Sequence, residues 1–301
     1  MIGYVIVLLA VLCFALQFAV TKIYEQSIQQ TAATSFAMLV VAGVVGACMY
    51  LCVGGFKVNV SAISLILAAI FAIIMIPYYV VSIKVLSLGS LAIYSMFMML
   101  GGMLLPFVYG LLFLNESISW GKIVGCVLMS VFIVLQGMAQ NQAENTKIKN
   151  KRLFFILCLC IFVVNGLTGV VAAIHQNHKN AVDEVSFTVL SCGIIVILGL
   201  VVLTAVCLFG NKSQNFAQAK SVIKGKPLFS VLGIGAAMHT GNFLILKAAS
   251  QIPASVQFPL ISGGTIVFSA IISVLCFKEK LSKKEVFCVA GAFASTVLFA
   301  F

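Results

Sequence analysis

The chain has 301 residues, of which 62% are hydrophobic and 8% are charged, whereas soluble domains carry about 25% charged residues. A mean hydropathy of +1.20 excludes a soluble globular protein, because so apolar a chain cannot keep its surface in water. The net charge of +11 does not indicate nucleic-acid binding, since the Lys and Arg residues lie between apolar runs, as in the loops that border membrane spans.

Ten apolar runs are long enough to cross a bilayer as helices, which takes about 20 residues each. The runs show no two-residue alternation, so they predict helices and not the strands of a barrel. The first run has no basic segment or cleavage site and predicts a span, not a signal peptide. The predicted spans are 2–21, 33–53, 61–83, 89–114, 120–138, 153–174, 185–209, 228–249, 254–276 and 285–301. The sequence therefore predicts an all-α membrane protein with ten transmembrane helices.

One pattern of residues occurs twice. Lys84 and Ser87 end the third span, a run with Gly101-Gly102 follows, and Glu116 and Ser119 come after it. The same order returns as Lys247, Ser250, Gly263-Gly264, Glu279 and Ser282. The Lys, Ser and Glu pairs are 163 residues apart and the glycine pairs 162. Such an ordered return of unlike residues indicates a duplicated unit.

A polar linker at 141–152 divides the chain into a first unit, 1–140, and a second unit, 153–301. Each unit has five predicted spans. Tandem copies of a unit with an odd number of spans must insert with opposite orientations. The sequence therefore predicts two inverted five-helix repeats, a plan of secondary transporters in which the substrate site lies between the repeats near the bilayer midplane.

The segment from Phe14 to Lys22 has a polar notch early in an apolar helix and a basic residue at its end. Asn115–Ser119 and Lys278–Ser282 each place a glutamate in a short polar turn, and glycines follow at 121, 125, 137 and 291. In this order the residues resemble the drug/metabolite transporter superfamily, in particular its ten-span EamA-type members, although Phe14-Ala15 stands where that family usually has Trp-Gly. The resemblance covers nearly the whole chain and implies export or exchange of small metabolites.

Polar side chains inside the spans are the candidate site residues, because they are costly in a bilayer and tend to face a cavity or a partner helix. Gln17 and Asn165 lie at matching points of the first helix of each unit. Their amides either bind substrate or join helices. His239, beside Asn242, either relays a proton or is a neutral histidine bonded to a carbonyl or hydroxyl group.

Four further residues are expected to line the cavity. Tyr78 and Tyr79 follow Pro77, which favours a kink, and their hydroxyl groups suit an organic metabolite. The alternative is that both rings are simply packed or interfacial. Tyr94 and Gln257 correspond at the 163-residue offset and precede the glycine pairs. All eight residues are predicted to bind substrate.

Charged residues mark the helix ends. Lys84 and Lys247 end the third helix of each unit, where they either gate the pore and attract an anionic group or extend to the membrane surface. Glu116 and Glu279 are expected to shape the turn before the fifth helix, whose dipole favours an acid there. A role in binding a coupling ion is the alternative.

The positive-inside rule and the family resemblance disagree about orientation. Loops after odd-numbered spans hold 14 of the 18 Lys and Arg residues, which would place those loops in the cytoplasm and both termini outside. The family usually has both termini inside. The first unit is balanced, with two basic residues in each class of loop, so the orientation stays open.

The leading hypothesis is a secondary transporter that moves a small organic metabolite, such as an amino acid, vitamin or nucleoside, by alternating access, with His239 as the residue for any proton coupling. A nucleotide-sugar or sugar-phosphate exchanger, with phosphate bound by Lys84 and Lys247, is the alternative within the superfamily. A non-transporting scaffold and a membrane-embedded enzyme are alternatives of other classes. The seven acidic residues are scattered, and no phosphate loop or Ser-His-Asp set is present, so we expect no enzyme.

The expected partners are a small-molecule substrate and the lipid bilayer of a bacterial-type plasma membrane, with the chain as a monomer or homodimer. No nucleic acid, cofactor or metal is expected. The ten Cys residues lie mostly in apolar runs without a second set of ligands, where cysteine usually behaves as a small hydrophobic residue.

Overall fold

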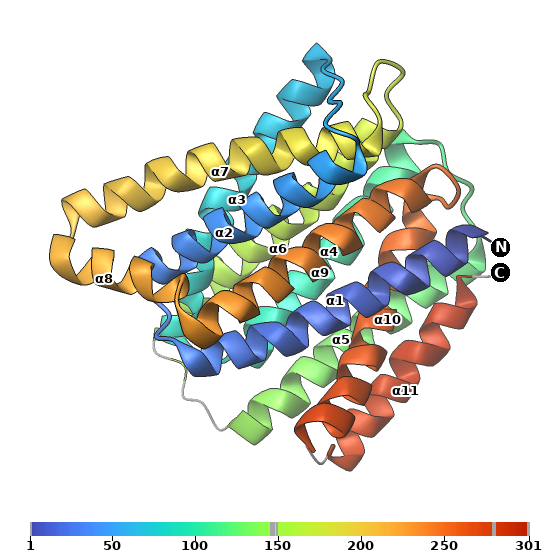
Figure 1. The fold of residues 1–301 in the computed structure, drawn as a ribbon. Coiled ribbons are helices and arrows are strands. Elements are labelled where there is room, and N and C mark those ends of the chain that lie inside the picture. Colours follow the sequence, from blue (N-terminus) through green and yellow to red (C-terminus); the bar gives the residue numbers. More distant parts are fainter. Residues whose placement is uncertain (1, 145–147, 149, 279–280, 300–301) are drawn as a thin grey trace.

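In a computed structural model of the protein, which describes residues 2–144, 148, 150–278 and 281–299, the chain forms helices and no strand (Figure 1). The helices are α1 (Ile2–Ser27), α2 (Ala32–Val53), α3 (Ala62–Leu88), α4 (Leu91–Phe113), α5 (Trp120–Glu144), α6 (Lys151–Gln176), α7 (Glu184–Phe209), α8 (Lys212–Val222), α9 (Gly225–Ala249), α10 (Ala254–Phe277) and α11 (Lys283–Leu298). The predicted all-α membrane fold is confirmed at this level.

Within those ranges, nine helices are long and apolar enough to cross a bilayer, namely α1–α7, α9 and α10. The tenth predicted span, 285–301, coincides with α11, whose 16 residues fall short of the roughly 20 that a straight span needs. The count of ten spans therefore stays a prediction. Helix α8 is short and polar, and lies in what the hydropathy pattern indicates is a loop.

Polar residues start most of the helices. Thr31 and Ser282 form capping boxes at the starts of α2 and α11, with Thr34 and Glu285 as the reciprocal partners. Such side chains satisfy backbone N–H groups that have no partner within the helix. Ser119 does the same for α5, because its Oγ accepts from the Lys122 backbone 3.2 Å away. Ser119 and Ser282, matched in the repeat, thus start equivalent helices.

The bundle has two ends, which we name after Gly3 and α8. At the Gly3 end, a Cβ on Gly3 would lie 2.9 Å from Ile252, which follows α9. Further along, a Cβ on Gly233 near the start of α9 would lie 3.3 Å from Val20 of α1. Helices α1 and α9 are therefore antiparallel neighbours. Figure 1 shows the first turn of α1 and the last turn of α11 on the side of the bundle away from α8.

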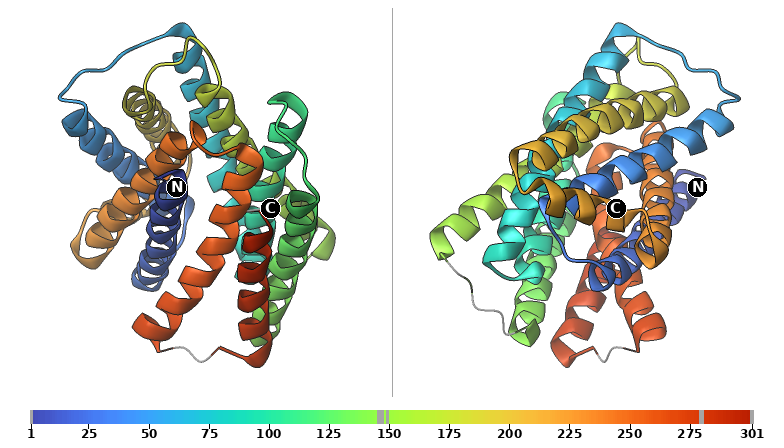
Figure 2. Two further views of the ribbon diagram at one scale, coloured as in Figure 1. Left: turned by 90° about the vertical axis from the view of Figure 1, so that its right-hand side faces the viewer. Right: turned by 60° about the vertical axis from the view of Figure 1, so that its left-hand side comes forward.

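Most extensive contacts join α1–α5, the first half, to α6–α11, the second half. Helix α1 packs on α9 and α10, and α6 packs on α3 and α4. Helices α2, α4 and α5 pack on α7, α10 and α11 respectively. The two views of Figure 2 show the helices of the two halves interleaved. The chain therefore does not fold as two separate bundles.

The closest crossing lies between α4 and α6. A Cβ on Gly101 would collide with the carbonyl group of Phe162, and one on Gly166 would lie 2.6 Å from the carbonyl oxygen of Gly101. Both obstacles are backbone atoms, so the two helices touch main chain to main chain. Small residues allow such close approach between membrane helices. Gly101, which belongs to the glycine pair of the repeated pattern, therefore allows this close contact.

Asp183 links the loop before α3 to the start of α7. Its carboxylate accepts from the Ser186 backbone at 2.9 Å, the Ser186 hydroxyl group at 2.7 Å and the Asn59 amide at 3.0 Å. Burial alone would raise the pKa of this carboxyl group, but these hydrogen bonds outweigh it and lower the pKa below its usual 3.8. Its contribution to stability is therefore present above that pH and is lost as the pH falls further.

Replacing Asp183→Asn should lower the melting temperature at pH 7 and lower it less at an acidic pH below 3.8, where the contribution of the native carboxylate is being lost. Thermal unfolding in detergent at the two pH values measures the difference. The control is Glu184→Gln at the next position, which removes a charge from the same helix start but no link to Asn59. Equal losses for Asp183→Asn at both pH values would contradict the expectation.

Candidate functional site

A cavity of about 130 Å³ opens between the two halves at the Gly3 end. The end of α6, the end of α9, the start of α10 and the turn after α4 surround it. Its lining residues are Leu114, Glu116, Ala172, Ala173, Gln176, Asn177, Ile245, Leu246, Ala249, Pro253, Ala254, Gln257 and Phe258. Its polar groups are one carboxylate and three side-chain amides, within otherwise apolar walls.

Glu116 joins the first half to the second. Its Oε1 accepts from the Ala254 backbone at 2.7 Å and its Oε2 from the Ser255 backbone at 2.9 Å. The residue is half-buried in the turn after α4, where Asn115 has a left-handed φ of 52°. A carboxylate at a helix N-terminus meets unpaired N–H groups and the positive end of the helix dipole. Glu116 therefore holds the start of α10 against the α4–α5 turn.

Gln257 is a fully buried amide on the cavity wall. Its Nε2 donates to the Ile245 carbonyl group at 2.6 Å, whereas its Oε1 has no partner. The carbonyl group accepts only from an N–H, so the orientation of this amide is fixed by its neighbour. An unpaired buried acceptor costs about 1–3 kcal/mol, which a hydrogen-bond donor in the cavity would recover.

Of the eight residues predicted to bind substrate, Gln257 lines this cavity. Tyr78 and Tyr94 instead meet between α3 and α4, where Tyr94 Oη lies 2.9 Å from Ser82 Oγ and 3.2 Å from Tyr78 Oη. The Tyr78 hydroxyl group also donates to Met98 Sδ at 3.0 Å. Tyr79 turns away, toward the Phe36 ring of α2, with centroids 6.4 Å apart. The tyrosines are thus divided between two interfaces.

Matching positions in the two halves make matching hydrogen bonds. Tyr94 bonds to Ser82 in the first half, and Gln257 bonds to Ile245 in the second. Both members of each pair are 163 residues from their counterparts. In each half, therefore, a polar side chain in the first turn of the fourth long helix reaches back to the end of the third.

The two first-helix amides have unequal surroundings. Asn165 Nδ2 donates to the Met98 carbonyl group of α4 at 2.8 Å, and a Cβ on Gly102 would lie 2.7 Å from this nitrogen. Gln17 is half-buried and makes no side-chain hydrogen bond within the described part of the chain. Asn165 therefore joins two helices, whereas the amide of Gln17 is available to a ligand.

His239 is buried among three helices, with 5% of its surface exposed. Its Nδ1 lies 3.4 Å from Cys192 Sγ of α7, and a Cβ on Gly46 of α2 would lie 2.5 Å from its ring. The Tyr50 hydroxyl group donates to the His239 backbone carbonyl group at 3.2 Å. Asn242, one turn later in α9, is half-buried. The histidine thus fills the contact between α2, α7 and α9.

Lys84 and Lys247 lie at opposite ends of the bundle. Lys84 is near the end of α3, which meets the start of α6, because a Cβ on Gly89 would lie 2.6 Å from Phe154. Lys247 is near the end of α9, beside the cavity at the Gly3 end. Both side chains are exposed. In both places the serine three residues later donates to the lysine carbonyl group, at 2.7 Å and 3.1 Å.

Sequence reasoning missed a polar cluster where α3, α6 and α7 meet. His175 is fully buried, its Nε2 lies 3.0 Å from Ser64 Oγ, and its ring stacks on Phe187 with centroids 3.7 Å apart. Ser64 Oγ also accepts from the Val182 backbone at 3.0 Å. No signal could have found this cluster, because a lone histidine at the end of an apolar run looks interfacial.

The described residues contain no group of three or more His, Cys, Asp or Glu placed to hold a metal ion. Glu279, matched to Glu116 in the sequence, lies outside these residues. The polar groups that line the cavity offer hydrogen bonds and one carboxylate.

Comparison with protein-family models gives no match, and comparison with curated proteins gives none either. Comparison with solved structures gives 28 chains whose fold matches that of this protein. One crystal structure matches with a TM-score of 0.72, over 98% of this chain and 95% of its own, at 13% sequence identity. The architecture is one already observed by crystallography. At this identity the likeness establishes the fold alone.

Proposed function

We propose that this multi-pass membrane protein is a secondary transporter of a small organic metabolite, of the EamA type within the drug/metabolite transporter superfamily, and that it works by alternating access. The observation that carries the proposal is the cavity between the halves, closed on one side by Glu116 of the first half and lined mostly by the second. A solute site bounded by both halves is what alternating access requires.

The helix contacts support an inverted repeat. Exchanging α1–α5 with α6, α7, α9, α10 and α11 in that order preserves the extensive contacts between these helices of the two halves: α1–α9 becomes α6–α3, α1–α10 becomes α6–α4, and α2–α7 is unchanged. The end of α6 and the end of α9 line the same cavity, near the start of α1, so α1 and α6 run in opposite directions. Opposite directions for equivalent helices are expected of inverted repeats.

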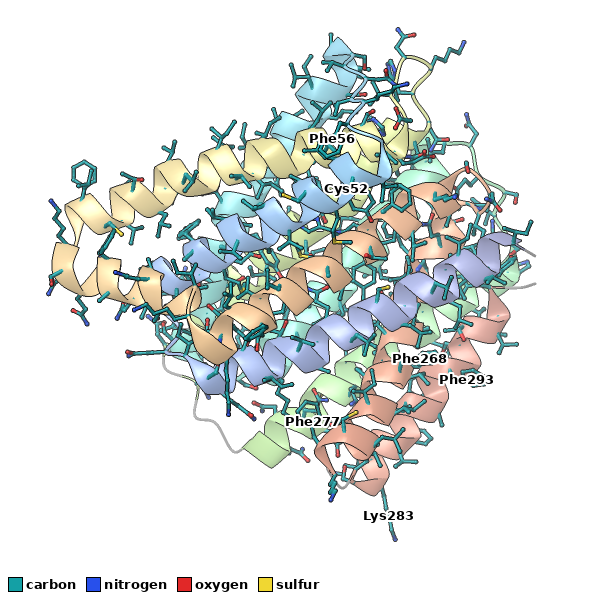
Figure 3. The ribbon with its side chains drawn as sticks, viewed as in Figure 1. Cys52, Phe56, Phe268, Phe277, Lys283 and Phe293 are labelled. Carbon is teal, nitrogen blue, oxygen red and sulfur yellow. The ribbon has the colours of Figure 1, made fainter. Side chains whose placement is uncertain are left out.

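The charge distribution supports an orientation with the α8 end in the cytoplasm. Among the described residues, the basic side chains at the Gly3 end are Lys57, Lys122, Lys179 and Lys247, and those at the α8 end are Lys22, Lys84, Lys151, Arg152, Lys212, Lys220, Lys224, Lys226, Lys278, Lys283 and Lys284. Lys283 projects from the start of α11 away from the bundle (Figure 3). Under the positive-inside rule the cavity then faces the outside.

The transport proposal is tested with purified protein in two steps. A thermal-shift screen against amino acids, nucleosides, vitamins and sugar phosphates selects solutes, and proteoliposomes preloaded with each solute then measure counterflow of its labelled form. We expect at least one stabilising solute to be exchanged. Stabilisation by solutes without counterflow of any of them would reject transport and favour a binding protein.

We expect His239→Gln to leave the pH profile of uptake in vesicles unchanged, because the imidazole is buried between α2, α7 and α9. Flattening of the profile would instead assign proton coupling to His239. Glutamine keeps a polar side chain at this position and removes the titratable ring. His178→Gln, at an exposed position after α6, is the matched control.

A further inference from the structure

We propose that the cavity between Glu116 and Gln257 binds the protonated amine of a small ligand. The proposal deepens and rests on the proposed transport function, because it names the chemical class that the site at the Gly3 end takes. It depends on which hydrogen-bonding groups of the cavity are already used and which are free.

Most of the donors around the cavity are occupied, apart from the amide of Gln176, which makes no hydrogen bond within the described residues. The first four backbone N–H groups of α10 are all paired: those of Ala254 and Ser255 donate to Glu116, and those of Val256 and Gln257 donate to the Pro253 carbonyl group. Asn177 Nδ2 donates to the Ala173 carbonyl group at 2.9 Å, and Gln257 Nε2 donates to Ile245. A helix N-terminus would ordinarily attract an anion, but here Glu116 already occupies it.

Two of the lining side chains, by contrast, can still accept hydrogen bonds. Gln257 Oε1 has no partner, although the side chain is fully buried. Each oxygen of Glu116 accepts one backbone N–H and has room for another donor. Glu116 is the one charged residue among those that line the cavity. An ammonium group, which offers three donors and a positive charge and accepts nothing, is complementary to this set.

The size of the cavity limits the rest of the ligand. A cavity volume of about 130 Å³ suits a small organic group. Leu114, Ile245 and Phe258 provide apolar wall beside the polar groups. The ligand, or the part of it that enters, is therefore an amine on a short apolar stem of a few carbon atoms.

The experiment compares three probes of nearly equal size and different charge: propylammonium, 1-propanol and propionate. Binding to the detergent-solubilised protein is followed by saturation-transfer NMR and by thermal shift at millimolar concentrations. We expect propylammonium to bind most tightly and propionate least. Tighter binding of propionate would overturn the proposal, because it would show that donors dominate the cavity.

Gln257→Met keeps the length of the side chain and removes its acceptor, so we expect a tenfold or larger loss of affinity for propylammonium, as for one hydrogen bond to a charged group. The matched control is Gln136→Met in α5, which removes another buried amide oxygen without a partner but outside the cavity lining. It should bind like the parent. If Gln257→Met does not fold, Glu116→Gln gives the same test through the charge. Unchanged affinity in the folded variant would overturn the proposal.

Binding and transport are measured separately, so their failures can be told apart. Amine binding in detergent that depends on Gln257, without counterflow of any solute in proteoliposomes, would keep the amine site and reject the transporter. Counterflow of solutes without amine binding would keep the transporter and reject the amine site.

Discussion

Gly101→Ala is expected to cause the largest loss of stability of any single methyl group added to the transmembrane bundle. The new Cβ would collide with the backbone carbonyl group of Phe162, which cannot move without shifting α6. Overpacking costs about 1–3 kcal/mol when side chains can adjust, and more when they cannot. We therefore expect a loss of at least about 3 kcal/mol, seen as a much lower melting temperature in detergent or as failure to accumulate in the membrane.

Two other Gly→Ala variants are expected to lose less stability than Gly101→Ala. A Cβ on Gly102 would meet the Asn165 amide nitrogen at 2.7 Å, and that side chain can turn aside, so Gly102→Ala should cost less. A Cβ on Gly193 of α7 has no heavy atom within 4 Å, so Gly193→Ala should be neutral or slightly stabilising, since alanine favours helices by about 1 kcal/mol over glycine. Equal melting temperatures for the Gly101 and Gly193 variants would contradict the packing described for α4 and α6.

The same crossing shows what the sequence could predict and what it could not. The sequence shows that each unit has a glycine pair, Gly101-Gly102 and Gly263-Gly264. These pairs are 162 residues apart, one fewer than the 163 residues that separate the Lys, Ser and Glu pairs. In the structure, Gly101 faces Phe162 of α6 and Gly264 faces Val11 of α1, so these two correspond at the 163-residue offset. Helices that are apolar all round carry no mark of which face meets a neighbour. That information becomes available only when the helices are packed.

Hydropathy predicted the long helices well, because length and apolar composition alone decide what crosses a bilayer. It missed α8, which is polar and starts at an Asn211 cap, since a short polar stretch between spans looks like a loop. Tyr94 and Gln257, paired by the 163-residue offset, both bond to the preceding long helix of their own half. Which of the two would line a cavity depends on neighbours that belong to the other half.

The position of the cavity could not be predicted from the sequence, for a related reason. Glu116 was expected to shape its own turn, and it does follow α4 directly. Its partners, however, are the backbone N–H groups of Ala254 and Ser255, 138 and 139 residues away. The pattern of side chains in a sequence does not indicate which backbone N–H groups a distant carboxylate will bind. An acid that caps a helix of the other half therefore looks in the sequence like an ordinary residue of a turn.

Glu116→Ala is expected to free the start of α10 and open the Gly3 end. The change removes two hydrogen bonds from backbone N–H groups to a charged acceptor, each worth about 1.5–3 kcal/mol when well shielded. Because Glu116 is half-buried, we expect a total of about 2 kcal/mol. Hydrogen exchange measured by mass spectrometry should then be on the order of 30 times faster at the amides of Ala254 and Ser255.

Glu116→Gln retains one good acceptor and should give an intermediate rate. The matched control is Glu285→Ala, which removes another glutamate that accepts from the backbone at a helix start, because Glu285 Oε2 accepts from the Ser282 backbone at 2.7 Å. That cap lies within one half, so its loss should speed exchange at the start of α11 and leave α10 unchanged. Slow exchange at Ala254 and Ser255 in Glu116→Ala would show that the two halves are held together at the Gly3 end by packing alone. Fast exchange confined to these amides, with the rest of the bundle protected, would instead identify Glu116 as the contact whose release lets the halves separate there.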